Sequence, residues 1–277
     1  MGFDFSQVGK RCEPLTFGYS WKDVVLYHLG IGAGTAELDF LLESAGPKVY
    51  PTFAVVPTFA ANLHVLSTIG GNLLTVVHGA QRIALHRPIP PEGTLRTTAV
   101  VSAIHDKGKG ALAIVRTETQ DSSGAALFDT EWQVFYRGEG GFGGERGPEA
   151  PAVEIPARDA DFREEQATQD TQSLLYRLSG DINPIHASPD IAKMAGFPRP
   201  ILHGLCTFGF VGRAAVRHAC GGDPARLKVL EARFAKLVFP GDTLITEGWR
   251  TGNRAALRVT TKDRQESVMS HAFVEVG

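Results

Sequence analysis

Cysteine is scarce in this sequence, which contains only Cys12, Cys206 and Cys220 among 277 residues. Three scattered cysteines are too few for a disulfide framework or a cysteine-rich zinc site, so we expect a reducing compartment. Net charge is nearly absent as well, at −2. This balance excludes a general basic field for nucleic acid or an anionic membrane. A local basic cluster for a phosphate-bearing ligand remains compatible with it.

Charged side chains are missing altogether from residues 49–81. An uncharged stretch of this length is compatible with a membrane span, but Pro51, Pro57 and the Gly70-Gly71 pair interrupt it. We therefore expect a buried helix with flanking strands and no membrane association. The N-terminus has no basic region before an apolar core, so no secretory signal is expected. The C-terminal residues 274–277 do not match a Ser-Lys-Leu peroxisomal address.

Three familiar kinds of site are also missing. No Gly-x-Ser-x-Gly motif exists for a serine hydrolase. The glycines of residues 30–34 resemble a dinucleotide fingerprint, but position 35 is Thr and no strand is expected before them. No His, Cys and carboxylate cluster has zinc spacing, so we expect no metal.

Glycine and proline concentrate in residues 137–151, and little there is able to pack. No Gly-Lys-Ser/Thr follows, which excludes a phosphate-binding loop. We interpret residues 138–157 as a linker between an N-terminal unit, 1–137, and a C-terminal unit, 158–277.

The two units repeat one pattern. Tyr27-His-Leu matches Tyr176-Arg-Leu, and Pro91-Glu-Gly-Thr-Leu matches Pro240-Gly-Asp-Thr-Leu, both at an offset of 149 residues. A recurring offset indicates a duplicated unit. In each unit a short amphipathic helix precedes a long apolar helix, near Pro57–Ile69 and His203–His218. Alternating segments typical of antiparallel strands follow: Thr94–Ala103, Ala111–Thr119, Ala126–Tyr136, Thr243–Trp249, Ala255–Thr261 and Ser267–Val276. We predict an α+β fold in which each helix packs on a curved antiparallel sheet.

The candidate chemistry lies in the second unit. Asp181, Asn183 and His186 fall within six residues on a turn bounded by glycine and proline, as acid–base chemistry requires. Gly204 stands at the expected start of the long helix, where free N–H groups are able to receive negative charge. The offset places Gly32, Gly34 and Glu37 opposite 181, 183 and 186. We therefore expect one active site per chain, with the first unit shaping a pocket.

Residues 178–186, 195–197 and 200–207 resemble the MaoC-like, type 2 enoyl-CoA hydratases, and the likeness extends over nearly the whole chain. The resemblance implies a double hot-dog fold and reversible syn hydration of trans-2-enoyl-CoA to (R)-3-hydroxyacyl-CoA. Coenzyme A is then part of the substrate, and no separate cofactor is expected. The missing peroxisomal address favours a cytoplasmic protein, and paired hot-dog chains favour a homodimer.

Asp181 and His186 are expected to hold one water as a coupled acid–base pair. The Gly204 N–H would receive the thioester oxygen. Asn183 either orients the water or contacts the substrate, or it only forms a turn before Pro184. His203 either lines the site or caps the long helix.

Several residues are candidates for substrate binding. His78 and Gly79 match a family segment that borders the substrate channel. Arg233, Lys236 and Arg254 match its coenzyme-binding region, although an ordinary solvated strand edge is the alternative. The uncharged stretch 49–81 would line the acyl tunnel. The other histidines are interpreted as scaffold or surface: His28, His64, His86, His105, His218 and His271.

Three other functions compete with the hydratase. One is a MaoC-like dehydratase that acts on acyl carrier protein or on a specialised steroid or branched acyl-CoA. Another is a non-catalytic module that binds acyl thioesters. A hot-dog thioesterase fits less well, because its sites do not resemble the Asp-x-Asn-Pro-x-His arrangement.

Overall fold

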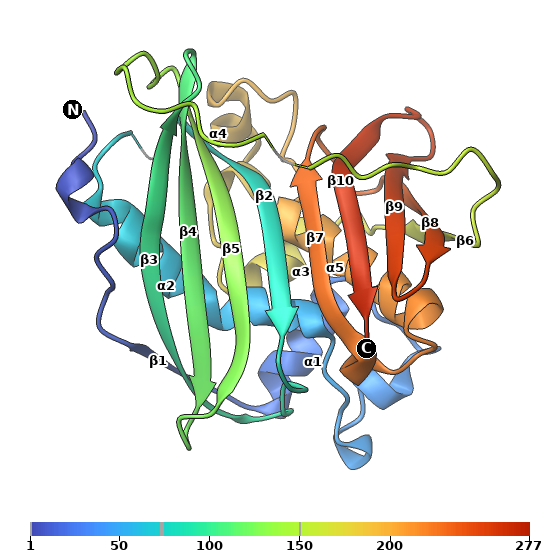
Figure 1. Ribbon diagram of the computed structural model, residues 1–277. Helices are drawn as coiled ribbons and strands as arrows, with labels where there is room; N and C mark the ends of the chain where they lie inside the picture. The colour runs from blue at the N-terminus through green and yellow to red at the C-terminus, as the bar shows by residue number, and fades with distance from the viewer. Residues whose placement is uncertain (1, 73–74, 150) are drawn as a thin grey trace.

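A computed structural model describes residues 2–72, 75–149 and 151–277 of the chain. Residues 73 and 74 of the uncharged stretch and residue 150 of the linker lie outside it. Ten antiparallel strands form one sheet in the order β1-β3-β4-β5-β2-β7-β10-β9-β8-β6, with the helices on one side (Figure 1). The first five strands along the chain are β1 (Leu15–Tyr19), β2 (Val76–Leu85), β3 (Gly93–Asp106), β4 (Gly110–Asp121) and β5 (Ala126–Arg137). The others are β6 (Phe162–Ala167), β7 (Leu227–Phe234), β8 (Thr243–Thr251), β9 (Arg254–Thr261) and β10 (Ser267–Val276).

The strand order is the same in both halves, read outward from the middle of the sheet. The two long helices, α2 (Val55–Thr68) and α5 (Gly204–Ala214), begin 149 residues apart (204 − 55). Shorter helices precede them: α1 (Trp21–Gly30), α3 (Gln172–Tyr176) and α4 (Pro189–Met194). The halves join where β2 pairs with β7, with Ala80 opposite Arg233. The predicted α+β fold, with a long helix against an antiparallel sheet in each repeat, is confirmed.

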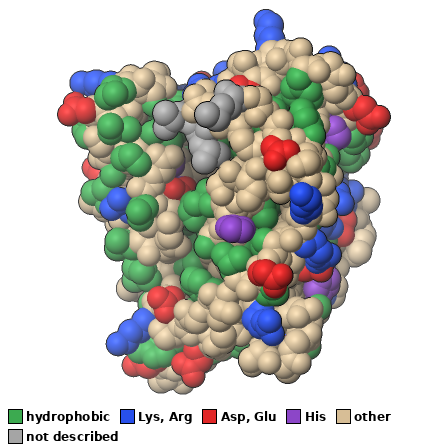
Figure 2. Space-filling model, turned by 90° about the vertical axis from the view of Figure 1, so that its left-hand side faces the viewer, with side chains coloured by type: hydrophobic (Ala, Val, Ile, Leu, Met, Phe, Trp, Pro, Cys, Tyr) green, Lys and Arg blue, Asp and Glu red, His purple; other side chains and the backbone are tan. Residues whose placement is uncertain are grey.

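The two long helices differ in burial. All residues of α5 after Gly204 are buried. Its glycines allow loops of the first repeat to approach closely, because a Cβ on Gly209 would lie 2.3 Å from the Ile31 side chain and one on Gly212 would lie 2.4 Å from Thr52. In contrast, α2 is amphipathic, and Leu63 on its outer face is 45% exposed. Figure 2 looks from the side where α2 and β1 lie in Figure 1, and hydrophobic side chains reach the surface over much of that face.

The sequence pattern did not predict four of the strands. These are the joining strands β2 and β7 and the edge strands β1 and β6. In β2 the period is broken by a bulge between His78 and Ala80, so its side chains do not alternate cleanly. Among the described residues, no helix is both long and apolar enough to span a bilayer.

The segment between the repeats packs more than its composition suggests. The ring of Phe142 lies 5.9 Å from that of Phe3 and 5.2 Å from that of Phe5, which anchors the segment against the N-terminal residues. In Figure 1 the segment passes in front of the sheet, on the side away from the helices. Phe142 therefore makes ring contacts, although none of the described residues of the segment is buried.

A buried histidine makes the stability of this fold depend on pH. The His28 Nδ1 atom lies 2.7 Å from the carbonyl oxygen of Phe40, and its Nε2 accepts a hydrogen bond from the Tyr50 N–H at 3.1 Å. The neutral ring satisfies both contacts, whereas a second proton would displace the Tyr50 N–H. Burial accordingly lowers the pKa of His28 to about 4.

We expect the free energy of unfolding to decrease as the pH falls below 6.5. In that range His28 becomes protonated in the unfolded chain, whereas the buried ring in the folded protein stays neutral down to about pH 4. The loss should be complete near pH 4 and reach about 3 kcal/mol for this histidine, at about 1.4 kcal/mol per pKa unit. Urea unfolding of the wild-type and His28→Gln proteins between pH 7.5 and 4 measures it. Identical pH dependence of the two proteins would contradict this assignment.

Candidate active site

A short turn carries the carboxylate and the imidazole of the candidate site. Gly180 has a φ of +128°, which a residue with a side chain rarely adopts, and it redirects the chain after α3. The backbone N–H of Asn183 then donates to the Asp181 carboxylate at 3.2 Å. Pro184 begins a 3₁₀ turn that ends at His186. These local contacts bring Asp181 and His186 to the same side of the turn.

The imidazole of His186 is buried and its tautomer is fixed. Its Nδ1 lies 2.8 Å from the carbonyl oxygen of Ile201, an acceptor that requires the proton to be on Nδ1. Nε2 is then left as a proton acceptor. Burial lowers the pKa of His186, and the charge of Asp181 opposes that shift. A neutral imidazole ready to accept a proton is what general base catalysis requires.

His203 packs against this imidazole. The two rings stack with centroids 3.7 Å apart, and His203 Nε2 lies 3.0 Å from the main-chain oxygen of Asp181. Burial, followed by the proximity of His186, lowers the pKa of His203 to about 2. A ring that stays neutral, donates to the Asp181 backbone and stacks on His186 orients both groups. His203 lines the site and also precedes the first residue of α5.

One side-chain oxygen or nitrogen each from Asp181, His186 and His203 lies within 4.8 Å of the others. A pair of polar atoms at this separation is able to share one small molecule such as water. The three residue types also occur in metal sites. Zinc spacing along the sequence did not reveal this group, because its third member comes from a separate segment. The absence of a metal stays a prediction.

The start of α5 lies next to the pair. Gly204 is the first residue of α5 and directly follows His203, so the first turn of the helix, whose N–H groups lack intrahelical acceptors, begins beside the stacked histidines. A Cβ on Gly204 would lie 3.2 Å from the ring of Phe234. The glycine therefore allows β7 to approach the helix end closely.

A cavity of about 890 Å³ is lined by residues of β2, β7 and the segment between the repeats, whereas Asp181, His186 and Gly204 are not among its described lining residues. Phe234, which contacts Gly204, is one of its lining residues. The cavity brings together four residues predicted to bind substrate: His78, Gly79, Arg233 and Lys236. His271, which we interpreted as scaffold or surface, lines it too. Arg254 is not among the described lining residues and instead lies over the Phe273 ring, 3.6 Å from its centroid.

Asn183 holds the turn together. Its side-chain oxygen accepts a hydrogen bond from the Ile185 N–H at 3.2 Å, and the residue is exposed. This geometry corresponds to the second of the two interpretations of Asn183, a turn before Pro184. Any contact of Asn183 with water or substrate stays a prediction.

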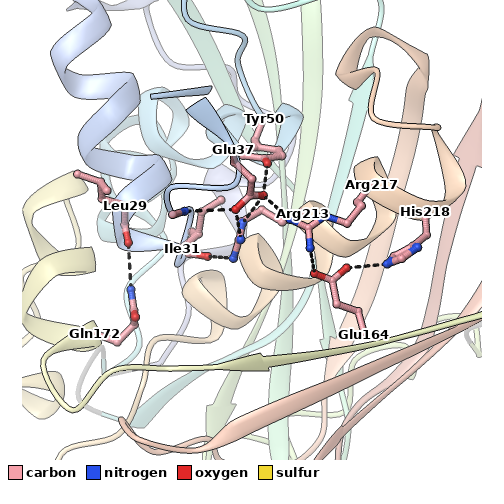
Figure 3. A network of polar contacts seen from close by, with 10 residues as sticks. Leu29, Ile31, Glu37, Tyr50, Glu164, Gln172, Arg213, Arg217 and His218 are labelled. Atoms are coloured by element: carbon pink, nitrogen blue, oxygen red, sulfur yellow. Dashed lines mark hydrogen bonds and ion pairs between the residues drawn. The ribbon is translucent and has the colours of Figure 1, made fainter. Parts of the chain in front are cut away.

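The first repeat has a different polar network at the matching place. Glu37, which the offset aligns with His186, forms a buried ion pair with Arg213 of α5 and accepts a hydrogen bond from the Tyr50 hydroxyl at 2.6 Å (Figure 3). Arg213 Nη1 also donates to the Ile31 carbonyl at 3.0 Å. The network continues through Arg217, Glu164 and His218. Glu37 therefore ties the repeats together, and Arg213 neutralises its charge.

The fold and this site define a double hot-dog protein with a carboxylate and an imidazole close to the start of a helix. Residues 17–138 match the MFE-2 hydratase 2 N-terminal domain, and residues 151–271 match the MaoC like domain. The chain is 43% identical to 3-hydroxyacyl-thioester dehydratase Y of Mycobacterium tuberculosis, over 91% of this chain and 89% of that protein. It is 39% identical to the peroxisomal enoyl-CoA hydratase 2 of Arabidopsis thaliana, over 94% and 91%. A MaoC-like dehydratase structure from Phytophthora capsici superposes with a TM-score of 0.90 at 30% identity, covering 99% of this chain and 98% of that one.

The chain belongs to the MaoC-like, type 2 enoyl-CoA hydratase family, as its motif indicated.

Proposed function

We propose that this protein catalyses the reversible hydration of trans-2-enoyl-CoA to (R)-3-hydroxyacyl-CoA. One observation carries the proposal: the side chains of Asp181 and His186 meet within 4.8 Å in a chain of this family. The start of α5 adds a place for negative charge beside them.

The pair has the groups that addition of water requires. A water held between Asp181 and Nε2 of His186 gives a proton to the pair as its oxygen bonds to C3 of the substrate. The C2–C3 π electrons move toward the thioester and form an enolate. C2 then takes a proton from the pair, which returns to its starting state. Since the two groups are coupled, we assign the two transfers to the pair and not to separate residues.

The enolate oxygen needs a donor. The first N–H groups of α5 are free of intrahelical acceptors, and the positive end of the helix dipole adds to their effect. In this proposal the Gly204 N–H donates to the thioester oxygen. Loss of one such donor commonly costs about 3 kcal/mol in the barrier.

One relative is named a 3-hydroxyacyl-thioester dehydratase and another an enoyl-CoA hydratase, and removal and addition of water are opposite directions of one type of reaction. The name of the Mycobacterium tuberculosis relative specifies a thioester and not coenzyme A. A dehydratase that acts on acyl carrier protein or on a specialised acyl-CoA therefore remains a competing hypothesis. A non-catalytic module would not require His186 and Asp181 to meet. The homodimer, the cytoplasmic location and the lack of a cofactor stay predictions. The Arabidopsis relative is named as peroxisomal.

The stereochemistry of the product tests the proposal. We expect crotonyl-CoA to lose its enoyl absorbance with this protein and to yield the (R) alcohol, because the family likeness implies addition to that face. An (R)-specific 3-hydroxyacyl-CoA dehydrogenase added with NAD should produce NADH, whereas an (S)-specific one should not. A signal from the (S)-specific enzyme, or no loss of absorbance, would refute the proposal.

A further inference from the structure

Four cationic side chains around the cavity have no ion-pair partner among the described residues. They are Lys107, Arg146, Arg233 and Lys236. None of them appears in an ion pair, whereas Arg82 and Arg116 on neighbouring strands pair with Glu231 and Glu131. Among the described lining residues, Glu149 is the one carboxylate. Unpaired cations around one cavity form a site for an anion with several charges.

Two of these cations come from segments that sequence analysis did not connect with substrate. Lys107 follows β3, and Arg146 belongs to the segment between the repeats. We call residues 138–149 the strap. The strap reaches the cavity because it is fastened to the β3–β4 turn. The Gly138 N–H donates to the Lys109 carbonyl at 2.9 Å, and the Asp106 N–H donates to the Glu145 carbonyl at 2.9 Å.

Asp106 is the centre of this attachment. Its Oδ1 accepts hydrogen bonds from the N–H groups of Gly108 and Gly141, and its Oδ2 accepts one from Gly143, each at 2.8 Å. Gly141 and Gly143 have φ values of +81° and +79°, so both positions favour glycine. A buried carboxylate that accepts three backbone N–H groups determines the path of the strap. The strap continues directly to Arg146.

The sheet is irregular beside Arg233. That residue pairs with Ala80 of β2 and with Ser270 of β10. Both partner strands have a bulge there, and His271 in the second bulge has a φ of +52°. Bulges redirect side chains and often occur next to functional sites. The irregular backbone therefore lies on the cavity wall, close to the cations.

We propose that Asp106 is a positioning residue that holds the strap so that Arg146 and Lys107 join Arg233 and Lys236 in binding the phosphates of a coenzyme A thioester. This inference rests on the proposed function. The diphosphate and the ribose 3′-phosphate of coenzyme A together carry about four negative charges near neutral pH. A carrier protein presents a single phosphodiester at this distance from its thioester. Four cations without ion-pair partners match the charge of coenzyme A. The single phosphodiester of a carrier protein would need fewer of them.

The test compares crotonyl-CoA with crotonyl-pantetheine, which has the same reacting atoms and no phosphate. We expect Arg146→Ala and Lys107→Ala each to raise KM for crotonyl-CoA about five- to tenfold, as loss of a partly exposed charged contact does, with kcat little changed. KM for crotonyl-pantetheine should change less than about twofold. Lys109→Ala is the matched control, because Lys109 lies in the same turn and is not a lining residue.

Asp106→Ala tests the positioning role. It should raise KM for crotonyl-CoA as much as Arg146→Ala does and weaken the dependence of that KM on salt, since fewer cations would face the phosphates. Adding Arg146→Ala to it should cause little further loss, because both changes remove the same contact. Asp106→Asn keeps one acceptor oxygen and should give an intermediate KM.

The outcomes separate the two claims. If the wild-type protein hydrates both thioesters and the Arg146 and Lys107 variants leave both KM values unchanged, the phosphate site is refuted and the proposed function stands. Equal increases for both substrates would also refute it, because a general structural effect would explain them. If the wild-type protein hydrates neither thioester, the proposed function fails and this inference fails with it.

Discussion

Replacing His186 with alanine will lower kcat for crotonyl-CoA hydration by about 10²- to 10⁴-fold, the range expected for loss of a positioned acid or base. The reason is the tautomer: the Ile201 carbonyl accepts the Nδ1 proton, so Nε2 is left as the proton acceptor of a ring that has a nitrogen within 4.8 Å of the Asp181 carboxylate. His64→Ala, at an exposed position of α2, is the matched control and should retain full activity. Loss of the enoyl absorbance measures the rate.

Asp181→Asn should cause a loss of the same order, because the amide keeps the shape of the side chain but cannot hold the proton. Asp190→Asn, on the exposed side of α4, is its control. Circular dichroism and the urea midpoint should be close to wild type for both active-site variants. Activity within about tenfold of wild type in either one would remove that residue from the catalytic pair.

The second large effect is on stability. Arg213→Met should destabilise the fold by about 3–5 kcal/mol, because the buried Glu37 carboxylate would then keep only its longer ion pair, at 3.3 Å, with the partly exposed Arg217. The side chains of Arg213 and Glu37 are only 7% and 8% exposed. Urea unfolding measures the loss. The double variant Glu37→Gln with Arg213→Met should recover much of it, since the carboxylate that lost its partner would then be neutral.

Arg116→Met is a useful control, because Arg116 forms an exposed ion pair with Glu131 and should contribute less than about 1 kcal/mol. If Arg213→Met is no more harmful than Arg116→Met, or if the double variant is less stable than the single one, the network in Figure 3 does not tie the repeats as described.

Much of the fold was predictable because a duplicated unit makes matching segments recur at one fixed offset in the sequence. The 149-residue offset that aligned Tyr27 with Tyr176 also separates the first residues of α2 and α5. The strand β10 was predicted with the same bounds that the structure has, Ser267–Val276. The strand β2 was not, because a bulge at Gly79 disturbs its period.

The close approach of Asp181 and His186 was predictable for a local reason. The two residues lie only five positions apart. The turn at Gly180 and the Asn183-Pro184 sequence restrict the backbone conformations available between them. His203 was harder to place, because its contact with His186 depends on how a separate segment returns to the turn. Spacing identified it as a candidate but could not distinguish a cap from a ring stacked at 3.7 Å.

Contacts between distant segments could not be predicted. The offset placed Glu37 opposite His186, yet nothing in the sequence indicated that Arg213, 176 residues away, would neutralise it. The strap was interpreted as a linker because it is held mainly by its backbone N–H groups. Every chain has such groups, so the composition of the segment does not indicate which of them form contacts. Arg254 matched a family segment, but its side chain stacks on Phe273 outside the cavity.

The most direct measurement of the central claim is a crystal structure with butyryl-CoA, a saturated thioester that cannot take up water. We expect a water within hydrogen-bond distance of both the Asp181 carboxylate and Nε2 of His186, facing C3 of the acyl group, with the thioester oxygen at the Gly204 N–H. An acyl group bound elsewhere, or one whose C3 faces neither side chain, would contradict the account.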